Sequence, residues 1–356
     1  MKRAPHPQRR RLVSWGQSTF AAQSGLTRKV SGLARGFSLV ELMVAIAIGM
    51  MLVAGLAVLF ANSSQSGNEI EKSVRQIENG RYALELISED VNLAGYYGEV
   101  PASGMTWVTA PACSTAVAAM GWDNAARTAP VAITGLDATE ASALTCLSNH
   151  KAGSVAVVLR RLDTAGVLPG ASTNGSAYLQ TSRCLTDPNA TRFILSTVAT
   201  DFTLRGLACT AGNTVNRYLV RIYYVATCNE CGVDTVPTLK RVELRGDQMR
   251  ISPLAEGIED IGYDYGFDTN GDGSADVYLL GLSGVAGAPE NDWSNVVGVR
   301  INLLSRSTEP SPGFVDGKTY ALGIAGTRGP FTDGHKRRAY AATSRLNNVA
   351  GPRETP

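Results

Sequence analysis

The chain has 356 residues, of which 44% are hydrophobic and 18% charged, and its formal net charge is +2 at pH 7. The positive charge lies at the N-terminus, because residues 1–36 contain eight Lys or Arg side chains and no Asp or Glu. Without that segment, 25 basic residues stand against 31 acidic ones, a net charge of −6. We therefore exclude a broadly basic nucleic-acid-binding surface and expect no direct nucleic-acid partner.

An uncharged apolar segment follows the basic region. Residues 42–61 hold no charged side chain and nothing more polar than Gly. About 20 such residues can cross a bilayer as a helix, and the basic residues in front of them predict a cytoplasmic N-terminal end. Glu41 stands at the edge of this segment, where an ionisable group is costly and usually functional. The sequence predicts a single membrane span followed by an ectodomain outside the cytoplasm.

The residues around Glu41 read Gly36-Phe37-Ser38-Leu39-Val40-Glu41-Leu42. A secretory signal carries its small-residue cleavage site after the apolar stretch, whereas here Gly36 precedes it. The string resembles the class III leader of type IV prepilins and pseudopilins. The resemblance implies that a prepilin peptidase cuts after Gly36 and methylates the new amino terminus at Phe37. The apolar segment is then kept as membrane anchor and later as filament core.

The same resemblance gives Glu41 a role in assembly. As the fifth residue of the processed chain, it matches the family's glutamate that pairs with the terminal amine of a neighbouring subunit. A carboxylate and an ammonium in a low dielectric are each costly alone and much less so when paired. The alternative is an uncleaved signal anchor in which Glu41 has no function.

A second helical pattern follows the polar residues 62–68. Apolar side chains recur at three-, four- and seven-residue intervals among charges, which predicts an amphipathic helix, at Ile70, Val74, Ile77, Leu84, Ile87 and Val91. The first proline after Gly36 is Pro101. We therefore expect one helix from Phe37 to about Ala94, roughly 85 Å long at about 1.5 Å per residue. Its first part is the transmembrane and filament-core helix of residues 37–61, and its second part, residues 62–95, continues into the ectodomain.

Two motifs in this helix narrow the resemblance. They read Glu78-Asn79-Gly80-Arg81-Tyr82-Ala83-Leu84 and Glu89-Asp90-Val91-Asn92-Leu93-Ala94-Gly95-Tyr96. Both are similar to the helix of the minor pilin family PilW, and the resemblance covers residues 36–98. By their spacing, Leu84, Ile87 and Val91 are expected in the core. Arg81 is interpreted as a surface residue, with a subunit contact as the alternative.

The remaining residues, 96–356, predict one β-rich globular domain. Loops with short strands are expected over residues 101–151, rich in Ala, Gly, Ser and Thr. Strand-like runs of apolar, β-branched and aromatic residues follow at 154–159, 192–196, 201–207, 217–226, 238–244 and 296–304. No helix-length pattern separates these runs, which argues against a doubly wound sheet. The predicted fold class is α+β and pilin-like, with the long helix packed on an antiparallel sheet that carries large disulfide-bonded loops.

The chain has six cysteines, all after the predicted membrane span: Cys113, Cys146, Cys184, Cys209, Cys228 and Cys231. An even number outside the cytoplasm favours disulfides, although fifteen pairings are possible. The CxxC at Cys228 and Cys231 could also be redox-active or half of a zinc site. No second CxxC exists, and the only histidines beyond the leader are His150 and His335. We favour structural disulfides, with Cys228–Cys231 as a short loop bridge.

An aspartate-rich stretch predicts a calcium site. Asp268, Asn270, Asp272, Ser274 and Asp276 occupy positions one, three, five, seven and nine of an EF-hand-like loop, with a Gly at position six. Position twelve is a leucine, so another oxygen, from Asp264 or Glu290, would have to complete the shell. The alternative is a plain turn in a hairpin between residues 263–267 and 277–280. We favour Ca²⁺, because three neighbouring aspartates repel one another without a cation.

No catalytic set emerges, so we expect a protein that is not an enzyme. The resemblance implies a PilW-like minor pilin that helps initiate or cap a type IV pilus and supports adhesion, twitching motility or DNA uptake. Its implied partners are the prepilin peptidase, other minor pilins, the major pilin and the inner membrane. Its ectodomain is expected in the periplasm and later at the cell surface. The alternatives are a type II secretion pseudopilin and a calcium-dependent tip adhesin.

Overall fold

The structure, a computed structural model, describes residues 36–100, 104–172, 175–187 and 192–354. Residues 1–35 of the expected leader lie outside the described residues. The chain divides into two compact units, Met1–Ala61 and Asn62–Pro356. The second unit contains every strand.

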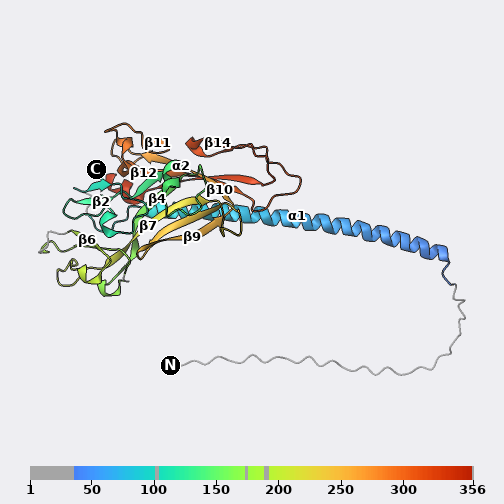
Figure 1. The fold of residues 1–356 in the computed structure, drawn as a ribbon, viewed down its shortest axis with the longest axis horizontal. Coiled ribbons are helices and arrows are strands. Elements are labelled where there is room, and N and C mark those ends of the chain that lie inside the picture. The colour runs from blue at the N-terminus through green and yellow to red at the C-terminus, as the bar shows by residue number, and fades with distance from the viewer. Residues whose placement is uncertain (1–35, 101–103, 173–174, 188–191, 355–356) are drawn as a thin grey trace, which may run out of the picture. The chain divides into compact units, whose positions relative to one another are not determined.

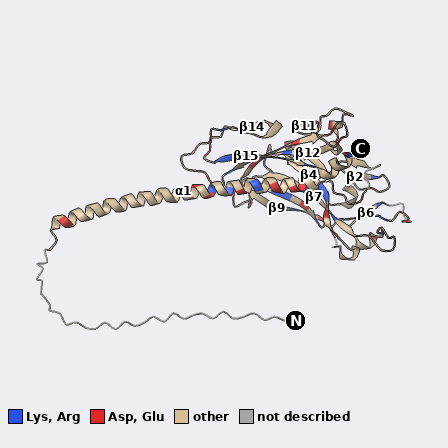
Figure 2. Cartoon of the chain, turned by 180° about the vertical axis from the view of Figure 1, so that it is seen from behind, with Lys and Arg blue, Asp and Glu red and all other residues tan. Residues whose placement is uncertain are grey.

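One helix, α1 (Leu39–Leu93), runs for 55 residues and supplies part of each unit (Figure 1). The prediction of a single uninterrupted helix is confirmed. In the first unit α1 is apolar beyond its first turn, whereas charged side chains line it in the second unit (Figure 2). Its buried positions recur every three or four residues, as expected for one face of a helix, at Gln76, Gly80, Ala83, Ile87, Asp90 and Val91.

The larger sheet has seven antiparallel strands. Its main path runs β3 (Ile133–Leu136), β4 (Ala156–Val167), β7 (Val215–Ala226), β5 (Tyr178–Thr181) and β6 (Phe193–Ser196). The second half of β7 also pairs with β8 (Thr238–Arg245), which pairs in turn with β9 (Gln248–Glu256).

The smaller sheet has four antiparallel strands in the order β11 (Val277–Leu279), β10 (Ile258–Phe267), β12 (Val296–Arg306) and β15 (Arg337–Arg345). Two minor pairs are β1 (Thr106–Val108) with β2 (Thr128–Pro130) and β13 (Tyr320–Ala321) with β14 (Thr327–Arg328). The short helices are α2 (Ala138–Ala143), α3 (Asn347–Ala350) and the 3₁₀ turns η1 (Val117–Ala119), η2 (Pro169–Ala171), η3 (Ala199–Asp201), η4 (Pro289–Asn291), η5 (Trp293–Asn295), η6 (Gly323–Ala325) and η7 (Gly351–Arg353).

Alternating residues of the larger sheet face two different cores. Val157 of β4 and Tyr223 of β7 join a core with α1 and with β10 and β12 of the smaller sheet. Their neighbours Val158 and Ile222 join a second core, built with Trp122 and other residues of the segment before β3. The larger sheet is therefore buried on both faces, and the helix covers one of them.

The predicted fold class, a long helix packed on antiparallel sheet with disulfide-bonded loops, is confirmed. The expected strand over residues 201–207 is wrong, because this segment contains the end of η3 and a single bridge between Arg205 and Gly212. In this segment side chains, not a neighbouring strand, accept hydrogen bonds from the backbone amides. Leu204 N donates to Gln180 Oε1 and Arg205 N to Asp187 Oδ2, so no regular ladder forms.

Candidate functional site

The start of α1 is closed by a pair of reciprocal hydrogen bonds. The Ser38 hydroxyl accepts from Val40 N at 3.2 Å, and the Glu41 carboxylate accepts from Ser38 N at 3.0 Å. This Ser-x-x-Glu arrangement satisfies amides that have no partner within the helix. Gly36 and Phe37 precede the helix and are exposed, so the predicted cleavage bond is accessible. Glu41 thus has a local role in the helix, in addition to the assembly role that we predict.

The apolar part of α1 presents its side chains to the surroundings. An 18-residue window of the helix has a mean hydropathy of 2.7, and none of it is buried. Side chains such as Leu39 and Phe60 are about three-quarters exposed, at 74% and 77%. A continuous apolar surface of this size marks contact with lipid or with other helices. It is the membrane-anchoring segment of the chain.

The first helix motif is explained by contacts with the sheet region. Asn79 Nδ2 donates to Glu256 O at 3.1 Å, and Ala83 is fully buried. Gly80 lies against the ring of Tyr340, so close that an added Cβ would be 2.5 Å from the ring. Arg81 and Tyr82 are exposed, as predicted for Arg81. The motif therefore combines a packed face with three exposed side chains, those of Glu78, Arg81 and Tyr82.

The second motif contains a buried carboxylate. Asp90, 3% exposed, lies between the core residues Ile87 and Val91 on the packed face of α1. It accepts from Arg221 Nη1 at 2.6 Å and from Arg161 Nη2 at 3.1 Å, and also from the hydroxyl of Tyr223. These partners belong to β4 and β7, so the bonds fasten the helix to the larger sheet.

The charges around Asp90 decide its protonation. Burial alone would raise the pKa of Asp90, but hydrogen bonds from Arg221 and Tyr223 and the charge of Arg161 outweigh it and lower the pKa below 3.8. Arg221 also donates through Nε to Glu243 Oε2 of β8 at 2.7 Å. The sequence analysis missed this network. The sequence did contain a signal for it, because Asp90 is an acidic residue on the otherwise apolar face of the amphipathic helix.

A second polar contact fixes the helix further toward its N-terminal side. Gln76, buried, donates to Ser305 O and Lys336 O at 3.1 and 2.9 Å. Glu69 accepts from Lys336 Nζ at 2.5 Å and from the hydroxyl of Ser311 at 2.6 Å. These bonds lower the pKa of Glu69 to about 2. The docked part of α1 is thus held by polar bonds near Glu69 and near Asp90, with apolar packing between them.

The aspartate-rich loop joins β10 to β11, and Phe267 pairs with Val277, so the hairpin that belonged to the alternative interpretation, a plain turn, is present. The Asp268 carboxylate is fully buried and accepts from the backbone amides of Gly271 and Gly273. It also accepts from Arg353 Nη1 at 2.9 Å. The positive charge near this aspartate comes from a side chain 85 residues further along the chain, which no local pattern could indicate.

The other predicted calcium ligands bond within the loop. Asp276 accepts from the amide and hydroxyl of Thr269, and Asp272 accepts from Ser274 N and from the Asn270 side chain. The suggested additional ligand Asp264 bonds instead to Asn302 and Ile324 N. Among the described residues no three acid, histidine or cysteine side chains are placed to hold a metal ion. In this arrangement the loop residues do not fit an assembled calcium shell.

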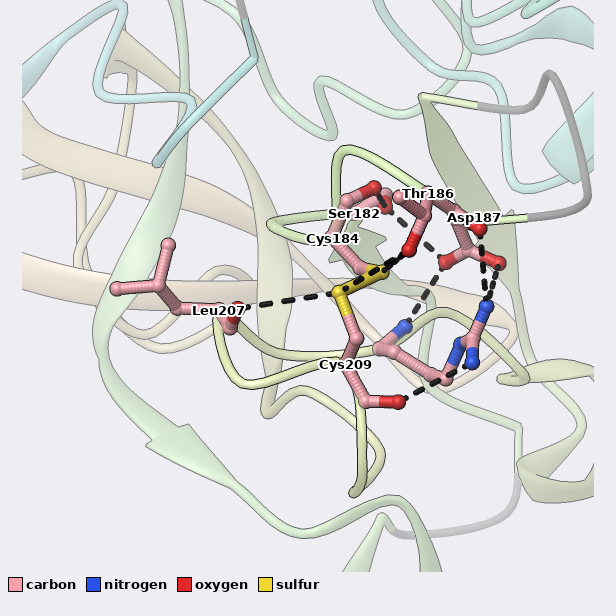
Figure 3. Close-up of a disulfide and its surroundings, with 7 residues drawn as sticks. Ser182, Cys184, Thr186, Asp187, Leu207 and Cys209 are labelled. Carbon is pink, nitrogen blue, oxygen red and sulfur yellow. Dashed lines mark hydrogen bonds and ion pairs between the residues drawn. A yellow bond between two sulfur atoms is a disulfide. The ribbon is translucent and has the colours of Figure 1, made fainter.

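The six cysteines form three disulfides, Cys113–Cys146, Cys184–Cys209 and Cys228–Cys231. The first two close loops of the larger sheet region with sequence separations of 33 and 25 residues. Figure 3 shows the Cys184–Cys209 bridge, where the Thr186 hydroxyl contacts both sulfur atoms at 3.4 and 3.6 Å. The favoured disulfide interpretation, including the short Cys228–Cys231 bridge, agrees with this geometry.

Comparison with known protein families gives two matches. Residues 222–348 match the family Type IV Pilus-assembly protein W, and residues 33–57 match the prokaryotic N-terminal methylation motif. The resemblance to PilW-like type IV pilus proteins is thereby confirmed. The PilW match lies in the ectodomain, whereas the helix motifs at residues 78–84 and 89–96 fall outside both matched segments.

Comparison with individual proteins adds little. Among solved structures, the type IV-like pilin TTHA1219 from Thermus thermophilus is similar over 78% of this chain and 98% of its own, with 12% identity and a TM-score of 0.35. No curated protein sequence matches the chain.

Replacing Gly80 tests the packing of α1 on Tyr340. We expect Gly80→Ala to lower the melting temperature of the full chain in detergent, because the new methyl group overlaps the ring and overpacking costs about 1–3 kcal/mol. This exceeds the gain in helix propensity of about 1 kcal/mol. Gly67→Ala is the matched control, since no atom lies within 4 Å of its added Cβ. It should stabilise the protein, and equal shifts in both variants would contradict the contact.

Replacing Asp90 tests the charge network. Asp90→Asn removes the anion that pairs with Arg161 and leaves Arg221 with Glu243 alone, and we expect a loss of about 3 kcal/mol in the free energy of unfolding at pH 7. The folded-state pKa of Asp90 is lowered, so its contribution is present above the unfolded pKa of about 3.9 and is lost as the pH falls through the folded value. The difference between wild type and variant, measured by urea unfolding, should therefore shrink below about pH 4. Glu89→Gln, exposed on the same helix, should change stability by less than about 0.5 kcal/mol at any pH.

Proposed function

We propose that the chain is a minor pilin of the type IV pilus, cut after Gly36, anchored by residues 37–61 in the inner membrane and carrying its ectodomain in the periplasm. The observation that supports this most is the uncovered apolar stretch of α1, which begins at the cap formed by Ser38 and Glu41. Such a helix can pass from lipid into a bundle of like helices because both surroundings are apolar. The subunit then helps to initiate or cap the filament.

The proposed partners follow from the same parts of the molecule. The prepilin peptidase acts at Gly36 and Phe37, which are exposed before the helix begins. Other minor pilins and the major pilin contact the apolar helix, and Glu41 pairs with a methylated amine of a neighbour. Adhesion, twitching motility or DNA uptake would be supported through the assembled pilus at the cell surface.

Two alternatives differ in what the ectodomain does. A type II secretion pseudopilin would share the leader and the helix, but the match of residues 222–348 to a pilus-assembly family favours the pilus. A tip adhesin needs a binding site, and a cavity of about 470 Å³ provides a location for one. It is lined by residues that follow α1, by two tryptophans and by residues of α3 and η7, including Tyr96, Trp107, Trp293, Asn348 and Arg353.

A structural role also accounts for the two histidines of the ectodomain. His150 contacts the hydroxyls of Ser142 and Ser154, and burial lowers its pKa. His335 Nδ1 lies 2.7 Å from Ser307 O. Neither has a carboxylate partner among the described ion pairs, so we propose a subunit that assembles and binds and does not catalyse.

Replacing Glu41 separates its two roles. Glu41→Gln keeps an oxygen that can accept from Ser38 N but removes the charge, whereas Glu41→Ala removes both. If Glu41 pairs with an amine, we expect both variants to be processed normally yet to assemble poorly. Processing is read from the mass of the chain and assembly from surface pili. Gly36→Leu supplies the unprocessed control, and full piliation with Glu41→Gln would leave only the capping role.

Calcium binding stays a prediction with its own test. Binding would require the Asp268 carboxylate to exchange Arg353 for the ion and the loop to turn its oxygens inward. A ligand of the folded state stabilises by about 2.7 kcal/mol at 100 times its Kd. We expect Ca²⁺ to raise the melting temperature of the full chain, Arg353→Ala to enlarge the shift, and Asp272→Ala to abolish it. No shift in wild type or Arg353→Ala would identify the loop as a turn neutralised by Arg353.

A further inference from the structure

The disulfide between Cys228 and Cys231 differs from the other two in size and exposure. It joins residues only three apart, in the loop between β7 and β8. Cys231 is exposed, whereas the other five cysteines are buried or half-buried. A bridge that closes so short a loop constrains the unfolded chain least. It can therefore open with less effect on the fold than the two long-range bridges.

A buried lysine points at this bridge. Lys240 of β8 is 6% exposed, and its Nζ lies 3.3 Å from Cys231 Sγ, its one hydrogen-bond partner among the described residues. No carboxylate of the described residues lies within ion-pair distance of Nζ, although the charge of Asp234 acts on it from further away. The nearest acid in the loop, Asp234, accepts instead from the backbone amides of Asn229, Glu230 and Val236.

This arrangement leaves the ammonium poorly compensated while the disulfide is closed. A disulfide sulfur is a weak acceptor, and a buried charge without a strong partner is costly. Arg160, also buried without a carboxylate, donates instead to the Thr134 hydroxyl and to Ala110 O. Lys240 would gain a full counter-ion only if Cys231 became a thiolate.

We propose that Cys228 and Cys231 form a thiol–disulfide exchange site for an external dithiol, with Lys240 as the residue that stabilises the Cys231 thiolate. The chemical class of the partner is a protein or small molecule with two neighbouring thiols. The proposal is independent of the chain's role in a pilus. It assigns a purpose both to the CxxC motif and to the buried lysine beside it.

The exchange proceeds in two balanced steps. A thiolate of the dithiol attacks the sulfur of Cys231, the Cys228–Cys231 bond breaks, and its electron pair stays on Cys228, which takes a proton from water. The Thr227 hydroxyl, 3.6 Å from Cys228 Sγ, can donate to that leaving sulfur. The second thiolate of the dithiol then attacks its own sulfur in the mixed disulfide. Cys231 leaves as a thiolate beside Lys240, and the dithiol has lost two electrons to the cysteine pair.

The Cys184–Cys209 bridge lacks this feature. Its nearby cation, Arg205, donates to Cys209 O and pairs with Asp187. The groups that contact the sulfurs, the Thr186 hydroxyl and the Leu207 carbonyl, are neutral (Figure 3). Its closed loop is also much longer. The Cys184–Cys209 disulfide therefore serves as the reference for a bridge with no lysine beside its sulfurs.

The test is a redox titration of the full chain in detergent with reduced and oxidised dithiothreitol. After acid quenching and alkylation, peptide mass spectrometry reads each of the six cysteines. We expect the Cys228–Cys231 pair to be half reduced at a reductant ratio at least about tenfold lower than either other pair, with the melting temperature nearly unchanged. Reduction of all three pairs together, or only on unfolding, would overturn the proposal.

A second measurement tests Lys240 directly. In the reduced protein, the pH dependence of Cys231 alkylation should show a midpoint at least one unit below the free-thiol value of about 8.5. Lys240→Met should raise it to that value or above, and Lys240→Arg should keep it low. Lys318→Met, which removes an exposed charge elsewhere, is the matched control.

The effect of Lys240 on the alkylation midpoint can be distinguished from the effects of the other titratable groups nearby. Backbone hydrogen bonds from Glu230 and Val236 lower the pKa of Asp234, so this carboxylate stays charged throughout the alkylation range, and Asn229 Nδ2 donates to Glu256 Oε1 at 2.7 Å. Tyr224, opposite Lys240 on β7, stays neutral there because burial raises its pKa to about 12. A change of midpoint in Lys240→Met therefore reports the lysine. If that variant does not fold, a wild-type midpoint at or above about 8.5 still refutes the assignment.

Discussion

The rest of the structure depends on the bond between Asp90 of α1 and the arginines of β4 and β7. A long amphipathic helix could slide or rotate on an apolar sheet, since apolar packing specifies position weakly. A helix with a buried carboxylate cannot slide in this way, because moving Asp90 away from Arg161 or Arg221 would leave buried charges uncompensated. This one contact fixes which turn of the helix lies on which strand.

Polar bonds at the other end of the docked part of α1 also fix the position of the helix. Gln76 and Glu69 contact the segment from Ser305 to Lys336, whereas Asp90 contacts the larger sheet. The helix is thus tied to both sheet regions, and buried apolar residues such as Ala83 and Ile87 lie between these bonds. Gly80 permits this approach, since any side chain there would meet Tyr340.

Sequence patterns predicted the elements whose signal is local. The single helix and the strands β4, β6, β7, β8 and β12 follow from periodicity, and the turn residues allowed the hairpin at Phe267 and Val277 as an alternative to a calcium loop. The failure at residues 201–207 arose because Gln180 and Asp187, distant in sequence, take the backbone amides of an apparently regular strand. The partner of Asp268 was equally invisible, because Arg353 approaches only after the chain has folded. Local periodicity cannot register such long-range pairs.

The buried charged residues of the ectodomain differ in how their charge is compensated. Asp90 has two arginines, Asp268 has Arg353, and Glu259 has Arg337, so these buried acids are neutralised by cations from distant elements. Lys240 is the converse, a buried cation whose partner is a disulfide sulfur. Arg160 is also buried without a carboxylate, but the Thr134 hydroxyl and Ala110 O accept its hydrogen bonds, whereas the one described acceptor for Lys240 Nζ is the disulfide sulfur. The imbalance is resolved when Cys231 carries a negative charge, which is why we connect the lysine with exchange chemistry at the short disulfide.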